Sequence, residues 1–213
     1  MDSKTVKFAR HWWKHRNESL FPNRWLGVPC WQNPLDVWII QEIIEETRPQ
    51  TIVETGTFFG GGALLWASLL SMFGDGKVFS IDVRDDRREA ATEHPLAKER
   101  VTFLTGSSAD QTVFDSVASQ CSDGSTMVIL DSDHSADHVC AELDLWSQLI
   151  TPGNYLIVQD GIITHLPDAD PPPGPLEAVE RWLPEHPDFE VDTARERMLF
   201  TLCPSGFLRK RGQ

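Results

Sequence analysis

Residues 51–67, TIVETGTFFGGGALLWA, decide the fold of this chain. The segment begins with a short β-branched and apolar run, passes through a glycine-dense turn and continues into a longer apolar run. This order predicts a buried strand at 51–55, a glycine turn at 56–62 and a helix at 63–73. Glycines in such a turn let the backbone approach a ligand closely, and the helix N-terminus faces that ligand.

The same alternation of strand and helix continues on both sides of this segment. Further strands are predicted at 77–82, 101–104, 126–131 and 154–160. Helices are predicted at 35–49, 85–94, 110–120, 136–150 and 176–183. The strands are almost entirely apolar, which is typical of a parallel sheet with helices on both faces. Two strand-like runs within 189–210 are close enough to pair as an antiparallel hairpin, so we predict a Rossmann-like α/β fold with seven strands.

Length, charge and composition limit the function classes. The 213 residues suffice for one core, and we expect one domain at 35–213 behind an N-terminal helical lid segment at 1–34. A formal charge of −13 disfavours nucleic acid and anionic membranes as partners and favours a small molecule. The four cysteines show no zinc-ligand spacing. Neither a secretion signal nor a membrane-length apolar run is present, so we expect a cytoplasmic protein.

The glycine turn and the end of the second strand predict a nucleoside site. Gly56, Thr57 and Gly60 belong to the turn, although their spacing is not GxGxxG. Asp82 closes the second strand, where a carboxylate accepts hydrogen bonds from ribose hydroxyls. A competing interpretation is that the glycines only form a tight turn and that Asp82 only caps the following helix.

Glu54 favours S-adenosylmethionine over a dinucleotide as the ligand. A carboxylate beside the turn is awkward near a pyrophosphate but compatible with the sulfonium and ammonium groups of S-adenosylmethionine. Ser107 and Ser108 follow the third strand, at the height of an adenine, and we predict that they bond its edge. The alternative for both serines is a turn followed by a helix cap.

Polar residues at the ends of the fourth and fifth strands predict a metal site. Asp131, Gln159 and Asp160 project from the same edge of the sheet, with Asp131 next to the nucleoside site. Oxygen ligands favour a hard divalent cation, Mg²⁺ first, which would act as a Lewis acid on a hydroxyl. His134 has the chemistry of a general base for that hydroxyl. Alternatively, the residues after Asp131 simply start the next helix, or His138 joins His134 in a two-histidine metal site.

The chain resembles the family of cephalosporin hydroxylases and of rhamnosyl or macrolide-sugar O-methyltransferases, which are class I S-adenosylmethionine-dependent enzymes. The matching segments span residues 25 to 210. They are WLGVPCWQNPLDVWIIQEIIEETRP, IVETGTFFGGGALLWA, VFSIDV, VILDSDHSADHVCAELDLW, PGNYLIVQDG and FTLCPSGFLRK. The resemblance implies a class I methyltransferase fold, a metal bound by Asp131 and Asp160, and His134 as the base. It also implies a homo-oligomer in which the N-terminal segment helps to close the site.

One position departs from the family pattern and leaves other functions open. Gln159 stands where the family usually has an acid, so a metal would be held more weakly, or Gln159 would only neighbour the ligands. The favoured function is metal-assisted O-methylation of a hydroxyl on a small natural product or sugar. The alternatives are an oxidoreductase like the cephalosporin hydroxylases and a non-catalytic partner that binds ligand for another enzyme.

Overall fold

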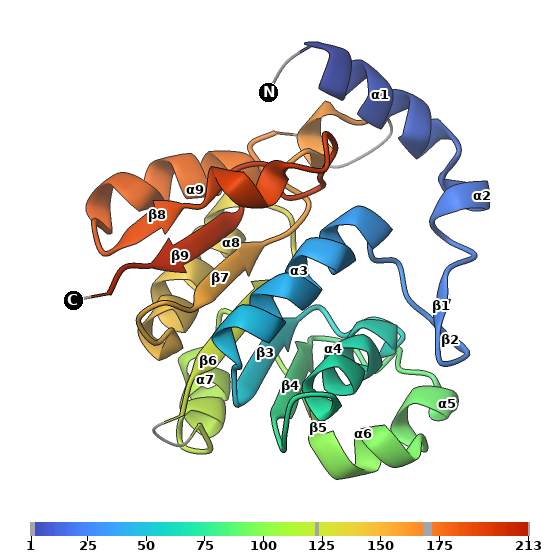
Figure 1. Ribbon diagram of the computed structural model, residues 1–213, viewed down its shortest axis with the longest axis vertical. Coiled ribbons are helices and arrows are strands. Elements are labelled where there is room, and N and C mark those ends of the chain that lie inside the picture. The colour runs from blue at the N-terminus through green and yellow to red at the C-terminus, as the bar shows by residue number, and fades with distance from the viewer. Residues whose placement is uncertain (1–2, 122–123, 168–171, 213) are drawn as a thin grey trace.

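The computed structural model describes residues 3–121, 124–167 and 172–212, and these form an α/β fold around one large sheet (Figure 1). The order of its seven strands is β5-β4-β3-β6-β7-β9-β8. The first five strands in this order are mutually parallel, and β9 is antiparallel to both of its neighbours. The strands are β3 (Thr51–Thr55), β4 (Lys77–Asp82), β5 (Val101–Thr105), β6 (Thr126–Leu130), β7 (Tyr155–Val158), β8 (Phe189–Val191) and β9 (Phe207–Lys210). The predicted seven-stranded sheet and its C-terminal hairpin are therefore confirmed.

Side chains alternate between two cores, one on each face of the sheet. Ile52 of β3 packs with α3 and α4, whereas Val53 belongs to the core beneath α7, α8 and α9. This period of two, with apolar residues on both faces, is the pattern that predicted a doubly covered sheet. The covering helices are α3 (Pro34–Thr47), α4 (Gly61–Ser71), α7 (Gln111–Ala118), α8 (Ala136–Trp146) and α9 (Pro175–Trp182).

The start of α3 is fixed by local sequence. Asn33 accepts a hydrogen bond from the Leu35 amide, and Pro34 occupies the first helical turn, where its missing N–H costs nothing. Asn33 also donates to Asp36, whose carboxylate accepts from the Leu202 amide at 2.8 Å. The N-terminus of α3 is thus tied to the segment that leads into β9.

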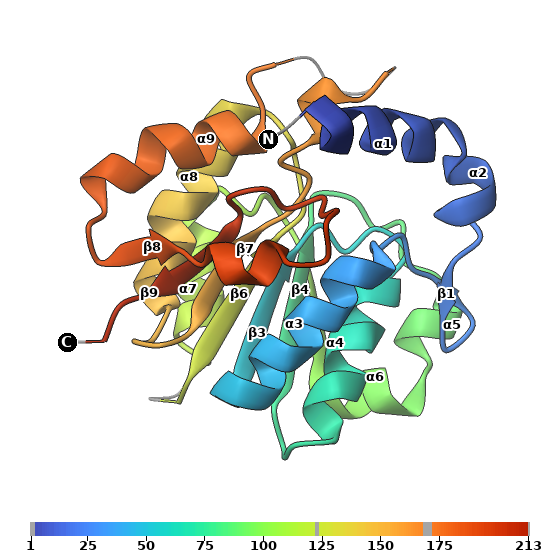
Figure 2. The ribbon, with the colours of Figure 1, turned by 45° about the horizontal axis from the view of Figure 1, so that its top comes forward.

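The N-terminal segment lies across one end of the sheet (Figure 2). It contains α1 (Ser3–Lys14), α2 (Arg16–Ser19) and a small hairpin of β1 (Arg24–Trp25) and β2 (Val28–Pro29). Helix α1 packs through Ala9 and Trp12 against a cluster that includes Ile163 and Phe200. None of the described helices combines the length and apolar character that a membrane span requires.

The polar helix predicted at 85–94 was wrong in extent. Only α5 (Glu89–Thr92) is helical there, and α6 (Pro95–Arg100) follows as a separate helix. Residues before α5 are bound elsewhere: the Arg88 amide donates to Phe59 O, and Arg87 Nη2 donates to Thr105 Oγ1 at 3.3 Å. The proline-rich stretch 165–175, HLPDADPPPGP, is described only in part, since 168–171 lie outside the described residues.

Candidate active site

A cavity of about 660 Å³ opens at the carboxyl ends of the parallel strands. Nine of the eleven predicted site residues line it, which brings the nucleoside and metal predictions into one place. These are Glu54, Gly56, Thr57, Asp82, Ser107, Ser108, Asp131, His134 and Asp160. The two that do not line the cavity are Gly60 and Gln159.

The glycine turn needs glycine because of close backbone contacts. Gly56 has a φ of +90°, and a Cβ there would lie 1.8 Å from the carbonyl oxygen of Asp131. The turn after β3 therefore packs directly on the chain that leaves β6. Gly60, with a φ of +87°, precedes α4, and a Cβ there would lie 2.7 Å from the Cβ of Ala91. Gly60 therefore affects the cavity only through the course of the backbone between β3 and α4.

Asp82 holds the loop that follows it as well as facing the cavity. Its Oδ2 accepts a hydrogen bond from the Phe58 amide at 2.8 Å, and its Oδ1 accepts from the Arg84 amide at 3.0 Å. The carboxylate thereby joins the glycine turn to the end of β4. Each oxygen keeps a second lone pair for a ligand hydroxyl.

Glu54 lies at the back of the cavity and is almost completely buried. Its Oε1 accepts from Trp66 Nε1 at 2.8 Å, and its Oε2 accepts from Ser80 Oγ at 2.6 Å. The Ser80 hydroxyl also bonds Thr57 Oγ1 at 2.7 Å. Burial raises the pKa of Glu54 to about 8 in spite of these donors. A positively charged ligand nearby would favour the ionised form.

Ser108 belongs to a polar cluster with His138 and a buried acid. His138 Nε2 lies 3.1 Å from Ser108 Oγ, 3.2 Å from Ser132 Oγ and 3.6 Å from Glu142 Oε1. Ser132 Oγ donates to Glu142 Oε1 at 2.7 Å. Glu142 is fully buried, and its Oε2 has no hydrogen-bond partner among the described residues. The nearby Glu142 carboxylate raises the pKa of His138.

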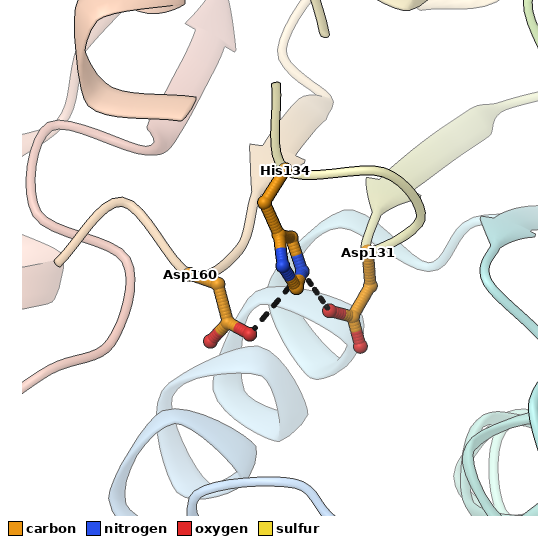
Figure 3. Close-up of side chains that lie close together, drawn as sticks. All are labelled: Asp131, His134 and Asp160. Atoms are coloured by element: carbon orange, nitrogen blue, oxygen red, sulfur yellow. Dashed lines mark ion pairs between the residues drawn. The ribbon is translucent and has the colours of Figure 1, made fainter. Parts of the chain in front are cut away.

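Asp131, His134 and Asp160 form the second cluster of the cavity (Figure 3). His134 Nε2 lies 3.4 Å from Asp160 Oδ2 and 4.0 Å from Asp131 Oδ1, and the three side chains are 21–26% exposed. One ligand atom from each lies within 4.8 Å of the other two, close enough to hold one metal ion. Two hard carboxylates and one imidazole, without thiolate, suit a divalent cation such as Mg²⁺ or Mn²⁺.

Backbone geometry directs Asp131 and Asp160 toward each other. The Asp131 amide donates to Thr55 O at 3.0 Å, which anchors the chain where it leaves β6. Asp160 has a φ of +54°, a left-handed conformation that costs a non-glycine residue energy and that clusters at functional sites. Asp133 instead accepts a hydrogen bond from the amide of Ser135, which is the N-cap residue of α8.

Gln159 departs from the predicted ligand set. It is 7% exposed, does not line the cavity, and its Nε2 is buried with no hydrogen-bond partner among the described residues. Its amide N donates to Leu130 O and so continues the pairing of β6 with β7. We therefore leave Gln159 out of the metal site proposed below.

The cavity also has an aromatic wall and a glutamine that are not among the predicted site residues. Trp31 stacks on Phe21 with ring centroids 4.2 Å apart and lies 4.7 Å from the Phe58 ring, and all three line the cavity. The next residue, Gln32, donates from Nε2 to Asp131 Oδ2 at 2.9 Å. Hydrophobic periodicity does not indicate these contacts, because they join residues from different segments of the chain.

Solved structures confirm the class I methyltransferase fold. A structure of CmcI with Mg and SAM matches 90% of this chain and 78% of that chain, with 22% identity and a TM-score of 0.68. An O-methyltransferase from Bacillus cereus in complex with SAH matches 89% of this chain and 83% of that chain, with 15% identity and a TM-score of 0.58.

Sequence comparison identifies the family. The Rhamnosyl O-methyltransferase/CmcI family profile matches residues 18–211. A rhamnosyl O-methyltransferase from Mycobacterium tuberculosis is 33% identical over 211 residues, 97% of this chain and 85% of the relative. Another from Mycobacterium leprae is 33% identical over 207 residues, 94% of this chain and 89% of the relative. The chain belongs to the Rhamnosyl O-methyltransferase/CmcI family, which confirms the resemblance and the predicted enzyme class, an S-adenosylmethionine-dependent O-methyltransferase.

Proposed function

We propose that this enzyme methylates a hydroxyl group of a small natural product or sugar with the help of a divalent cation. The observation that carries the proposal is the convergence of Asp131, His134 and Asp160 in the cavity that also holds the glycine turn and Asp82. The names of the mycobacterial relatives support a sugar hydroxyl as the acceptor. Mg²⁺ is the favoured cation.

The nucleoside end of S-adenosylmethionine would lie between the glycine turn and the end of β5. Asp82 would accept from the ribose hydroxyls, and Ser107 and Ser108 would bond the adenine edge. The backbone of Gly56, Thr57 and the turn through Gly60 would face the methionine part, with Glu54 behind it. This arrangement uses the predicted cofactor residues that line the cavity and explains why a buried acid stands beside a cationic donor.

Asp131 and Asp160 would hold the cation, and His134 would act as the general base. A bound divalent cation would lower the pKa of the acceptor hydroxyl and orient its oxygen. His134 Nε2, facing both carboxylates, would take the hydroxyl proton as the oxygen attacks the methyl carbon and the bond from carbon to sulfur breaks. The carboxylates would stabilise the imidazolium that results.

The geometry weakens the oxidoreductase interpretation. Iron-dependent oxygenases commonly use two histidines and one carboxylate, whereas the cluster described here has one histidine and two carboxylates. Closure of the site by residues 1–34, a homo-oligomeric state and a cytoplasmic location stay predictions.

Calorimetry with S-adenosylhomocysteine tests the proposal first, followed by methyl transfer to a rhamnoside with and without Mg²⁺. We expect binding of S-adenosylhomocysteine and methylated product that disappears with EDTA and returns with Mg²⁺. Absence of binding at millimolar ligand would remove the cofactor site. Product formation that is unaffected by EDTA would remove the cation from the mechanism, and cofactor binding without product from any hydroxyl acceptor would favour a non-catalytic partner.

A further inference from the structure

One contact joins the N-terminal segment to the metal cluster. Gln32 lies between β2 and α3, and its side-chain amide donates to Asp131 Oδ2 at 2.9 Å. The other oxygen of the same carboxylate, Oδ1, faces His134 Nε2 at 4.0 Å. The two oxygens of Asp131 therefore have different partners, one in the N-terminal segment and one in the cluster.

The residues next to Gln32 hold its backbone in place. Trp31 stacks on Phe21 and donates from Nε1 to Phe21 O at 3.1 Å. Asn33 caps α3 and bonds Asp36, which accepts from the Leu202 amide. Because the backbone of Gln32 is held between two anchored neighbours, forming the bond costs little backbone entropy, and the side-chain entropy is the cost that remains.

An uncharged donor suits this position because the cavity is rich in acids. Its lining includes Glu54, Asp82, Asp131, Asp133 and Asp160, and Arg84 is the one lysine or arginine among the described lining residues. A lysine or arginine bonded to Asp131 would offset the charge that attracts a cation. The glutamine amide orients the carboxylate and leaves that charge in place.

We propose that Gln32 is a positioning residue that fixes the Asp131 carboxylate for cation binding, an inference that rests on the metal site proposed above. With the backbone anchored at Thr55 and Oδ2 anchored at Gln32, Oδ1 stays directed toward His134 and Asp160. Partners that orient a metal ligand in this way contribute about 10- to 100-fold to metal affinity. Because Gln32 follows Trp31, the same short segment contributes to the aromatic wall and to the order of the metal site.

The test compares Mn²⁺ affinity, followed by electron paramagnetic resonance, with affinity for S-adenosylhomocysteine, followed by calorimetry. Gln32→Leu keeps the approximate size of the side chain and removes the donor. We expect the Kd for Mn²⁺ to rise about tenfold, while the Kd for S-adenosylhomocysteine changes by less than about twofold. This split separates orientation of a ligand from general damage to the cavity.

Gln111→Leu is the matched control. Gln111 also donates to an aspartate, Asp115 Oδ1 at 2.7 Å, but on the exposed surface of α7. We expect this control to bind Mn²⁺ as the wild type does. Should Gln32→Leu fail to fold, Gln32→Met is judged by the same numbers, because an unbranched apolar chain disturbs packing less.

The outcomes separate the two claims. If the wild type and Gln32→Leu bind Mn²⁺ equally well, Gln32 has no positioning role, but the proposed metal site is supported. An equal loss of Mn²⁺ and S-adenosylhomocysteine affinity would also overturn the role, because the substitution would then have disturbed the whole cavity. A wild type that binds no Mn²⁺ would remove both the metal site and the role of Gln32.

Discussion

His134 and His138 lie four residues apart and line the same cavity, but they meet different partners. His134 lies between two carboxylates that are each 21–26% exposed. His138 faces Glu142, which is completely buried, and two serine hydroxyls. The same side-chain pair, histidine with carboxylate, thus occurs once open to ligand and once anchored in the core.

Accessible polar groups are suited to chemistry, whereas buried ones are suited to holding the structure. The carboxylates around His134 can exchange partners when a cation or hydroxyl arrives. Glu142 has no such freedom, and one of its oxygens is already buried without a partner among the described residues. Breaking its contact with His138 would therefore cost folding free energy. Substitution of the two histidines should therefore have different effects.

His134→Ala should have the largest effect. It should lower turnover and leave ligand affinities nearly unchanged. Loss of a general base lowers kcat about 10³-fold, whereas affinity for S-adenosylhomocysteine and Mn²⁺ should change by less than about threefold. Methyl transfer to a rhamnoside, calorimetry and electron paramagnetic resonance check these values. Loss of Mn²⁺ binding in this variant would make His134 a metal ligand instead of the base.

Asp160→Asn should abolish most metal binding. The substitution keeps the shape of the side chain but removes the charge of a proposed ligand, so Mn²⁺ affinity should fall by at least about 100-fold, the upper end of the range for residues that only support a ligand. Asp133→Asn, a change to an acid whose partner is Ser135, serves as the control and should bind Mn²⁺ normally. Equal binding by both variants would rule out Asp160 as a ligand.

His138→Ala should affect stability more than His134→Ala does. Removing the ion-pair partner of buried Glu142 should lower the free energy of unfolding by about 2 kcal/mol, measured by urea denaturation. The pKa of His138 is raised above 6.5 in the folded state, so its charge stabilises the fold fully below about pH 6.5 and this contribution is lost as the pH rises through the raised value. The difference between wild type and variant should therefore shrink from pH 6 to pH 9. A difference that is independent of pH would contradict the charged pair.

Glu54→Gln should change how stability depends on pH. The pKa of Glu54 is raised from 4.5 to about 8, so the folded state holds an extra proton between these values and wild-type stability falls as pH rises across that range. Without the ionisable group, the slope should flatten by at most about 1.4 kcal/mol per pH unit. Urea denaturation in EDTA measures it, and an unchanged slope would show that Glu54 ionises normally.

Local sequence predicted most of the sheet because its strands are apolar on both faces. The predicted bounds of β3 and β4 agree with the structure at every residue, and the glycine turn between β3 and α4 follows from steric need at Gly56. The helix predicted at 85–94 was wrong in extent, because the Arg88 amide bonds Phe59 O and the Arg87 side chain bonds Thr105. Such tertiary hydrogen bonds leave no trace in periodicity.

The sequence predicted those site residues that follow the ends of strands. It did not predict contacts between segments that are far apart in the chain. Asp131 and Asp160 follow β6 and β7, so parallel pairing alone brings them to one edge. Gln32 reaches Asp131 across 99 positions, and nothing near Gln32 in the sequence indicates that contact. Gln159 lies beside a proposed ligand but is not among the residues that line the cavity, and a role for it at the metal stays a prediction.

A crystal structure with Mn²⁺ and S-adenosylhomocysteine tests the central claim most directly. Anomalous scattering locates the ion without assumptions about its ligands. We predict one Mn²⁺ ion bonded to carboxylate oxygens of Asp131 and Asp160, next to the sulfur of S-adenosylhomocysteine and within reach of His134. An ion bound elsewhere, or no ion beside a fully bound S-adenosylhomocysteine, would contradict metal-assisted methyl transfer at this site.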